Sequence, residues 1–307
     1  MIRLGFFFLF PLFTLLATDF AVTYEFSSGR LGDNLLSYLH AKWFSFQRDI
    51  PLIYRPFFYS SELVLDDLET SYGIPEKKPL ARNFIVRGPF HAISLPAIYA
   101  CPYFPEDKWE LEQDKSWFYF EVDWKDPAFR KIARQMIAPK HPLPLITPPS
   151  DTINIAIHVR QGGGYDHSLI HLQIPLKLPP LSFYIEGLLK IMNLFPNRPL
   201  YCYLFTDAVN PSELAQEMKR FLPPLTAIAF DYRRAENHHS KNVLEDFFSL
   251  FNFDILIRPQ SNFSLVVSLL NDYAIVYSPK NFKIENNIVT ITETDFIIDP
   301  QQLSRLQ

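Results

Sequence analysis

Residues 153–164, Ile-Asn-Ile-Ala-Ile-His-Val-Arg-Gln-Gly-Gly-Gly, decide the fold of this chain. They begin with a short, apolar and largely β-branched run that is typical of a buried strand, which we expect over residues 153–159. The three glycines that follow let the backbone turn sharply and approach a ligand closely. A buried strand leading into a glycine turn favours a parallel sheet with a ligand site beyond the carboxyl ends of its strands.

The sequence after this strand repeats the alternation of strand and helix. Apolar strand patterns recur at residues 200–205, 227–232, 255–257 and 274–277, and helix patterns lie at 182–194, from Pro211 onward, at 242–251 and at 263–270. Short apolar strands that alternate with helices predict a parallel sheet covered by helices on both faces. We therefore expect a Rossmann-like α/β domain over residues 150–307.

A proline-rich stretch separates this domain from the sequence before it. The run Pro139-Lys140-His141-Pro142-Leu143-Pro144, followed by Pro148-Pro149, can neither continue a helix nor pair inside a central strand. It predicts an extended linker and a domain boundary near Ser150. Before it, strand patterns lie at residues 22–26, 84–86 and 118–122, and helix patterns at 33–44 and 127–137. These predict a second α/β domain over residues 22–149.

The first 21 residues form a segment of their own. Arg3 precedes the apolar run Leu4 to Ala17, and Asp19 follows it closely. A short positive start and an apolar stretch of this length are typical of a signal peptide or an N-terminal anchor. We expect residues 1–21 to direct export or membrane association; the alternative is a buried strand or helix at the start of the fold.

Composition excludes several functions. The 307 residues are 48% hydrophobic and 20% charged, which is typical of a globular chain. The net charge of −4 provides no basic field, so we expect no nucleic-acid partner. The two cysteines, Cys101 and Cys202, form no cluster with zinc spacing. An anionic ligand must therefore be held by local groups.

Five of the nine glycines fall into two clusters that each follow a predicted strand. The first cluster is Gly29-Arg30-Leu31-Gly32-Asp33-Asn34, between a strand and a helix. A helix start beside such a turn offers free N–H groups and a partial positive charge to phosphate. The alternative is an ordinary tight turn with Asp33 as the helix cap. The spacing is neither that of a P-loop nor that of a Gly-x-Gly-x-x-Gly fingerprint.

The second cluster, Gly162 to Gly164, follows His158-Val159-Arg160 at the end of the central strand. A guanidinium at this position could grip two phosphate oxygens in a fork that lysine cannot reproduce. The alternative for Arg160 is a surface ion pair. His158 alternates inward with Ala156, so a hydrogen-bonded core histidine is the favoured interpretation over catalysis.

Later motifs supply further polar groups at strand ends and helix starts. Glu245-Asp246 lies in a predicted helix, and Thr206-Asp207 ends a predicted strand. Ser261-Asn262-Phe263-Ser264 precedes an apolar helix, where capping explains one polar residue and a phosphate or sugar hydroxyl could use the same N–H groups.

The order of these motifs resembles that of the α-1,2-fucosyltransferase family and of the wider superfamily of α-1,6- and protein O-fucosyltransferases. The family's Gly-x-Leu-Gly-Asn-Gln turn is similar to residues 29–34, and its His-x-Arg-Arg-Gly-Asp motif is similar to residues 158–163. Its acidic helix and Ser-x-Phe-Ser turn are similar to Glu245-Asp246 and to residues 261–264. Order and spacing agree over residues 22–278, although the intervening segments match poorly.

The resemblance implies a GT-B fold, in which two Rossmann-like α/β domains face a donor-binding cleft, with residues 22–149 as the acceptor side. It implies an inverting fucosyltransferase that transfers fucose from GDP-fucose to a glycan hydroxyl without a metal or other cofactor; the lack of Asp-x-Asp is consistent with this. The implied donor-binding residues are Gly29, Arg30, Gly32, Asp33, Asn34, His158, Arg160, Gly162, Asp207, Asp246, Ser261, Asn262, Phe263 and Ser264.

For catalysis, we expect Arg160 to stabilise the leaving diphosphate. Asp166, His167 and Glu245 are candidates for the base that deprotonates the acceptor. The chain departs from the family's motifs at Gln161, where the family has its second arginine, at Gly163, where it has aspartate, and at Asp33, where it has asparagine. Two alternatives remain: a transferase that uses another nucleotide sugar, and a non-catalytic sugar- or nucleotide-binding protein on a decayed transferase fold.

Overall fold

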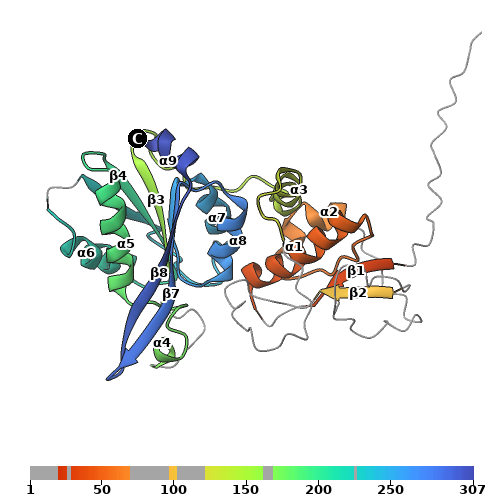
Figure 1. Ribbon diagram of the computed structural model, residues 1–307, viewed down its shortest axis with the longest axis horizontal. Helices are drawn as coiled ribbons and strands as arrows, with labels where there is room; N and C mark the ends of the chain where they lie inside the picture. The colour runs from red at the N-terminus through yellow and green to blue at the C-terminus, as the bar shows by residue number, and fades with distance from the viewer. Residues whose placement is uncertain (1–19, 26–28, 70–96, 102–121, 162–168, 225–226) are drawn as a thin grey trace, which may run out of the picture.

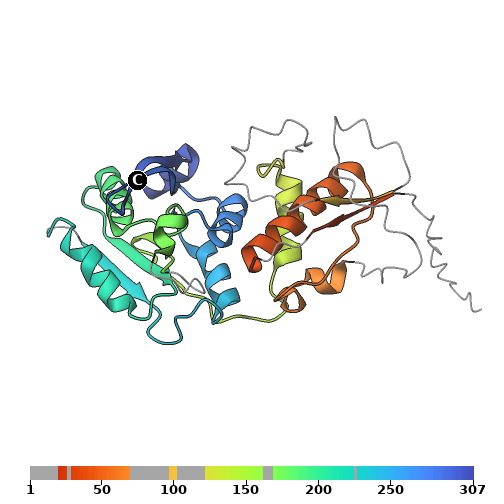
Figure 2. The same ribbon diagram turned by 90° about the horizontal axis from the view of Figure 1, so that it is seen from below.

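The structure is a computed structural model that describes residues 20–25, 29–69, 97–101, 122–161, 169–224 and 227–307. Its strands form two sheets, one in each half of the molecule (Figure 1). The chain crosses between the halves through residues 141–149, which have no regular secondary structure, as the predicted proline linker requires. Figure 2 shows this crossing from below.

The larger sheet follows the linker and has six strands in the order β5-β4-β3-β6-β7-β8. β3 (Ile153–Val159) is central, pairs in parallel with β4 (Leu200–Thr206) and β6 (Ile255–Ile257), and buries all seven of its residues. β5 (Ile228–Tyr232) and β7 (Ile275–Glu285) extend the parallel sheet on either side. Burial on both faces explains why the sequence of β3 is a continuous apolar run.

Helices cover both faces of this sheet. One apolar core lies under α5 (Leu181–Leu194) and α6 (Pro211–Arg220), and a second lies under α7 (Val243–Ser249) and α8 (Asn262–Leu270). A 3₁₀ turn, η4 (Leu250–Asn252), follows α7, and a short helix, α4 (Ile170–Gln173), precedes α5.

The first half contains the two-stranded parallel sheet of β1 (Phe20–Tyr24) and β2 (Ala97–Cys101). The long helix α1 (Leu31–Arg48) packs on it, and α2 (Leu65–Leu68), α3 (Pro127–Ile137) and the 3₁₀ turn η1 (Ser60–Glu62) lie around α1. α1 ends where Asp49 takes a left-handed conformation, φ 51°.

The two halves share a core. The cluster that contains the buried side of α1 and α3 continues into α7 and α8 of the second half. The starts of α1 and α8 touch, because a methyl group added to Gly32 would lie 2.5 Å from the Asn262 carbonyl carbon and 2.6 Å from Phe263 Cα. Glycine is required here because only a residue without a side chain lets the two backbones come this close.

The strand–helix alternation after residue 150 is confirmed, and the boundaries of α3 and β3 agree with prediction at both ends. The limits of α1 differ: the helix begins two residues before Asp33 and continues four residues past Phe44. The expectation that residues 274–277 close the series was wrong. β7 runs on to Glu285 and returns as the antiparallel strand β8 (Ile288–Ile298), which leads to α9 (Pro300–Leu306). Most of this hairpin is exposed, so its sequence lacks the long apolar run that marks a strand buried on both faces.

Other expectations fall on residues that the structure leaves undescribed. The predicted strand at 84–86 and all but Val122 of that at 118–122 lie outside the described residues, as does nearly all of the predicted export segment. In the described ranges, no helix has both the length and the apolar character that a membrane crossing needs.

Candidate functional site

A cavity of about 640 Å³ lies between the two halves, at the carboxyl ends of β3 and β4. The first half contributes the start of α1 and the turn at Phe58-Tyr59. The second half contributes the ends of β3 and β4, the loop before α7 and the start of α8. The lining residues are Gly29, Arg30, Leu31, Gly32, Asp33, Phe58, Tyr59, His158, Arg160, Lys177, Phe205, Thr206, Asp207, His238, His239, Ser240, Lys241, Val243, Asp246, Ser261, Asn262 and Phe263.

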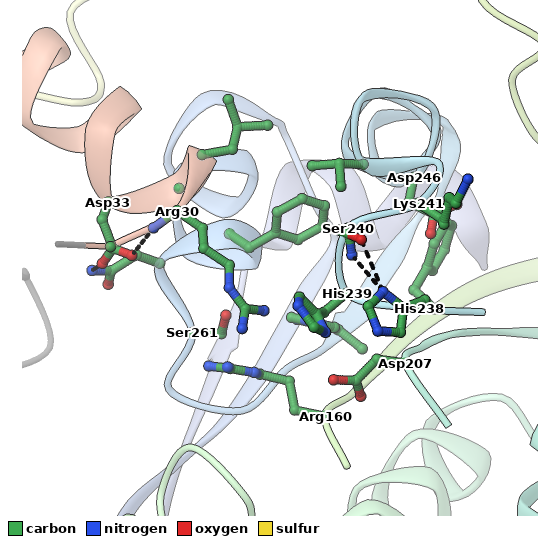
Figure 3. A pocket seen from close by; sticks show the side chains of 18 of the residues that line it. Arg30, Asp33, Arg160, Asp207, His238, His239, Ser240, Lys241, Asp246 and Ser261 are labelled. Carbon is green, nitrogen blue, oxygen red and sulfur yellow. Dashed lines mark hydrogen bonds between the residues drawn. The ribbon is translucent and has the colours of Figure 1, made fainter. Parts of the chain in front are cut away.

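Two arginines from opposite halves converge in this cavity. Arg30 precedes α1, and Arg160 follows β3. In Figure 3 their guanidinium groups point toward the same space, with Ser261 beside them. Like charges brought together in this way repel, and an anion between them removes the repulsion. The planar fork of each guanidinium matches the oxygens of a phosphate.

Two helix starts reinforce this positive region. Gly29 to Asp33 at the start of α1 and Ser261 to Phe263 at the start of α8 all line the cavity. The first N–H groups of a helix lack partners within the helix, and the helix dipole makes this end positive. Two such ends in contact form a site that favours a phosphate group.

Asp33 ties the two helix starts together. Its Oδ2 accepts a hydrogen bond from the Arg30 backbone N–H at 3.0 Å, and its Oδ1 accepts one from Asn262 Nδ2 at 2.7 Å. Asn34 Nδ2 donates to the Gly29 carbonyl at 3.3 Å and closes the turn. The N-cap residue of α1 is therefore Arg30, and Asp33 is the third residue of the helix, whose side chain accepts a hydrogen bond from the N-cap backbone. The alternative in which Asp33 itself is the N-cap was wrong. Asn34 is buried and is not among the lining residues.

His158 is buried below the cavity. Its Nδ1 lies 2.8 Å from Ser264 Oγ, and its ring centroid lies 5.5 Å from that of Phe263. Burial, with the positive charges of Arg160 and Arg258, lowers the pKa of His158 to about 3. The imidazole is therefore neutral at physiological pH, as the favoured interpretation of a hydrogen-bonded core histidine requires. Its bond to Ser264, which does not line the cavity, anchors α8 to β3.

Asp207 supports the turn that carries Arg160. Its Oδ1 accepts a hydrogen bond from the Gln161 backbone N–H at 2.6 Å, which joins the ends of β3 and β4. Gly162, Asp166 and His167 lie outside the described residues.

The acidic helix α7 presents one of its two carboxylates to the cavity. Asp246 lines the cavity, and Glu245 is not among the lining residues. Arg233 Nη2 binds both, at 2.7 Å from Asp246 Oδ1 and 3.2 Å from Glu245 Oε2. Burial raises the pKa of Asp246, although Arg233 opposes that rise. Glu245, predicted as a catalytic base, thus has its carboxylate in an ion pair beside the cavity.

Several lining residues were missed by sequence reasoning. Lys177 lies in a segment held at the start of α8 by the bond from Gln260 N to the Leu176 carbonyl, 2.8 Å. His238, His239, Ser240 and Lys241 belong to the loop after β5. A signal for this loop existed, because it follows the carboxyl end of a predicted parallel strand. For Lys177 and for Phe58-Tyr59 the sequence carries no such signal.

The charges favour an anionic ligand over a cation. The described lining residues include four permanently basic side chains, on Arg30, Arg160, Lys177 and Lys241, and three carboxylates, on Asp33, Asp207 and Asp246. Each of these carboxylates already accepts a hydrogen bond from the protein. Within the described ranges, no group of three or more His, Cys, Asp and Glu side chains is arranged to hold a metal ion.

The fold is similar to that of a solved structure. A mutant of Arabidopsis thaliana FUT1, solved in complex with GDP, superposes with a TM-score of 0.53 over 87% of this chain and 71% of that chain, at 14% identity. The chain has a GT-B-like fold. This confirms the predicted fold class, and at this identity the likeness concerns the fold alone.

Weaker likenesses are found to two other fucosyltransferases. NodZ from Bradyrhizobium matches at 14% identity over 92% of this chain and 99% of that chain, with a TM-score of 0.44. POFUT1 in complex with GDP-fucose matches at 12% identity over 84% and 95%, with a TM-score of 0.41. TM-scores below 0.5 are too low to support an inference. No protein-family model matches the chain, and no curated protein matches it significantly.

Proposed function

We propose that this protein is a glycosyltransferase that transfers L-fucose from GDP-fucose to a hydroxyl group of a glycan, with inversion at the anomeric carbon and without a metal. The observation that carries the proposal is the convergence of Arg30, Arg160 and the starts of α1 and α8 on one cavity of a GT-B-like fold. The choice of GDP as nucleotide is supported by the motif resemblance and by the GDP present in the FUT1 structure.

The proposed reaction breaks the bond between the anomeric carbon and the β-phosphate oxygen of the donor. It forms a bond from that carbon to the acceptor oxygen, whose proton is lost to a base or to water. Negative charge grows on the departing GDP as the bond breaks. Arg160, Arg30 and the N–H groups at the start of α8 stabilise this charge, and loss of one such donor typically slows a reaction about 10²–10³-fold.

The acceptor's proton has several candidate destinations. Asp246 lines the cavity with a raised pKa, and Asp166 and His167 follow the strand that carries Arg160. Glu245 is the weakest candidate, since Arg233 binds its carboxylate beside the cavity. His158 is a poor base because its low pKa leaves it with little affinity for a proton.

A second candidate function is non-catalytic binding of a nucleotide or nucleotide sugar. The observation that favours it is that Asp33, Asp207 and Asp246 are all occupied by hydrogen bonds from the protein. A binding protein needs the positive cavity and no base.

Turnover of radiolabelled GDP-fucose separates the two functions. The transferase is expected to release GDP slowly even without an acceptor, because water can take the fucosyl group. Arg160→Lys keeps the charge and loses the fork, so turnover should fall about 100-fold. GDP-fucose that binds without any release of GDP or fucose would favour the binding protein. If UDP- or CMP-sugars raise the Tm of the protein and GDP compounds do not, GDP-fucose is excluded as the donor.

A further inference from the structure

Two aromatic side chains of the first half, exposed Phe58 and partly buried Tyr59, line the cavity and have no role in the phosphate contacts proposed above. Phe58 is 71% exposed, and it lines the cavity beside Tyr59. The two rings meet edge to face, with centroids 4.4 Å apart and an interplanar angle of 68°. Phe58 differs from other exposed apolar side chains such as Phe221 in that its ring lines the cavity, where a bound ligand can cover it.

The backbone of this turn is held in an unusual conformation. Tyr59 has φ 72° and ψ −6°, in the left-handed region that a bulky residue rarely adopts. Such conformations persist only where the surroundings enforce them, and they cluster at ligand sites. The Tyr59 hydroxyl donates to the Ser240 carbonyl at 3.3 Å, so the turn of the first half is linked to the loop of the second across the cavity.

A polar network, buried at Tyr54 and Ser60 and partly exposed at Asp66, Asp67 and Lys140, supports the turn. Ser60 Oγ accepts the Phe57 N–H at 2.9 Å and lies 2.7 Å from the Tyr54 hydroxyl, which in turn donates to Asp66 at 2.9 Å. Lys140 binds Asp66 and Asp67, at 3.1 and 2.6 Å. The exposed ring of Phe58 thus projects from a turn whose support is rigid, a form of preorganisation that lowers the entropic cost of binding.

We propose that Phe58, supported by Tyr59, is the acceptor subsite, where the apolar C–H face of a pyranose ring of an oligosaccharide stacks on the Phe58 ring. The inference rests on the proposed function and names the acceptor side of the same cavity. The position fits an acceptor better than the donor. Phe205, which also lines the cavity, is only 2% exposed, whereas the exposed Phe58 belongs to the first half, and Arg160 and β3 belong to the second.

The competing role for Phe58 is stacking on the donor's purine base. The two roles make opposite predictions for a Phe58→Ala variant. As an acceptor platform, Phe58 contributes to oligosaccharide affinity and leaves the GDP affinity unchanged. As a base platform, it contributes to GDP affinity.

The test is calorimetric titration of the full chain, first with GDP and then, once GDP-loaded, with cellotetraose, maltotetraose, chitotetraose and lactose. At least one oligosaccharide is expected to bind. Phe58→Ala should weaken it about tenfold or more, and Phe58→Trp should restore it. GDP affinity should stay within about twofold in both variants. Phe221→Ala is the matched control, because Phe221 is 62% exposed and is not among the lining residues.

Each contrary result has a distinct meaning. GDP binding with no oligosaccharide bound, or with binding that Phe58→Ala leaves unchanged, overturns the acceptor subsite and leaves the donor site intact. Weaker GDP binding by Phe58→Ala overturns it in favour of base stacking. Failure of the unaltered chain to bind GDP overturns the proposed function itself, and the subsite with it.

Discussion

Replacing Gly32 with alanine perturbs the contact between the starts of α1 and α8. The added methyl group would lie 2.5 Å from the Asn262 carbonyl carbon, 2.6 Å from Phe263 Cα and closer still to the Phe263 amide nitrogen. Ordinary contacts of this kind begin at 3.4 Å, so the two backbones must separate by nearly 1 Å. Backbone atoms at a helix start cannot swing aside as the end of a flexible side chain can.

This overlap sets the size of the expected effect. Overpacking in a close contact costs about 1–3 kcal/mol, which lowers Tm by roughly 2–4 °C for each kcal/mol in a chain of this size. The same displacement widens the site formed by the two helix starts. Because a shift of about 1 Å can cost a site two orders of magnitude in rate, we expect GDP to bind at least tenfold more weakly.

Gly187→Ala is the matched control. A methyl group there would lie 2.5 Å from Cδ1 of Tyr277, on the face of the sheet opposite α8. It should lower Tm and leave the GDP affinity unchanged. Thermal denaturation and GDP titration of both variants separate the effects. If Gly32→Ala keeps the original Tm and GDP affinity, the close approach of the two helices does not shape the site.

Three further predictions concern Arg160, His158 and residues 1–21. Arg160→Ala should keep a near-normal Tm and lose more turnover than Arg160→Lys; a destabilised chain with normal turnover per folded molecule would instead mark Arg160 as a structural ion-pair residue. His158→Gln should make the free energy of unfolding less dependent on pH below 6.5. With a folded pKa near 3, His158 is protonated only in the unfolded chain between about pH 6.5 and 3, so the free energy of unfolding of the original chain falls by roughly 2 kcal/mol from pH 6.5 to 5. Urea titrations that give both proteins the same dependence on pH would contradict this. Residues 1–21 should direct export or membrane attachment, and recovery of the unprocessed chain only in the soluble cytosol would refute it.

The centre of the second half was predictable because its middle strands, β3, β4 and β6, are buried on both faces. A strand such as β3, with seven buried residues in a row, must be apolar throughout, and that run is visible in the sequence. The hairpin of β7 and β8 was not predictable by the same rule. Residues 281–285 are all exposed, and the polar residues Asn281, Lys283 and Glu285 alternate there with Phe282 and Ile284, so this part of the strand has no continuous apolar run.

The site was predictable where glycine or a strand end marks it. The turns that carry Arg30 and Arg160 were found through their glycines, and both residues line the cavity. The role of Asp33 was not predictable, since its bond to Asn262 joins residues 229 positions apart. The turn at Phe58-Tyr59 depends on a polar network from Tyr54 to Lys140, and such distant partners leave no local pattern.

Calorimetric comparison of GDP, GMP and guanosine tests the central claim, that the cavity holds a nucleoside diphosphate through Arg30, Arg160 and the two helix starts. The account predicts one GDP per chain, progressively weaker binding of GMP and guanosine, and a GDP affinity that falls at least tenfold in both Arg30→Ala and Arg160→Ala. In each of these two variants, the GDP affinity should also depend less on salt concentration than it does in the original chain. Equal affinity for GDP and guanosine, or unchanged GDP affinity in both arginine variants, would contradict it.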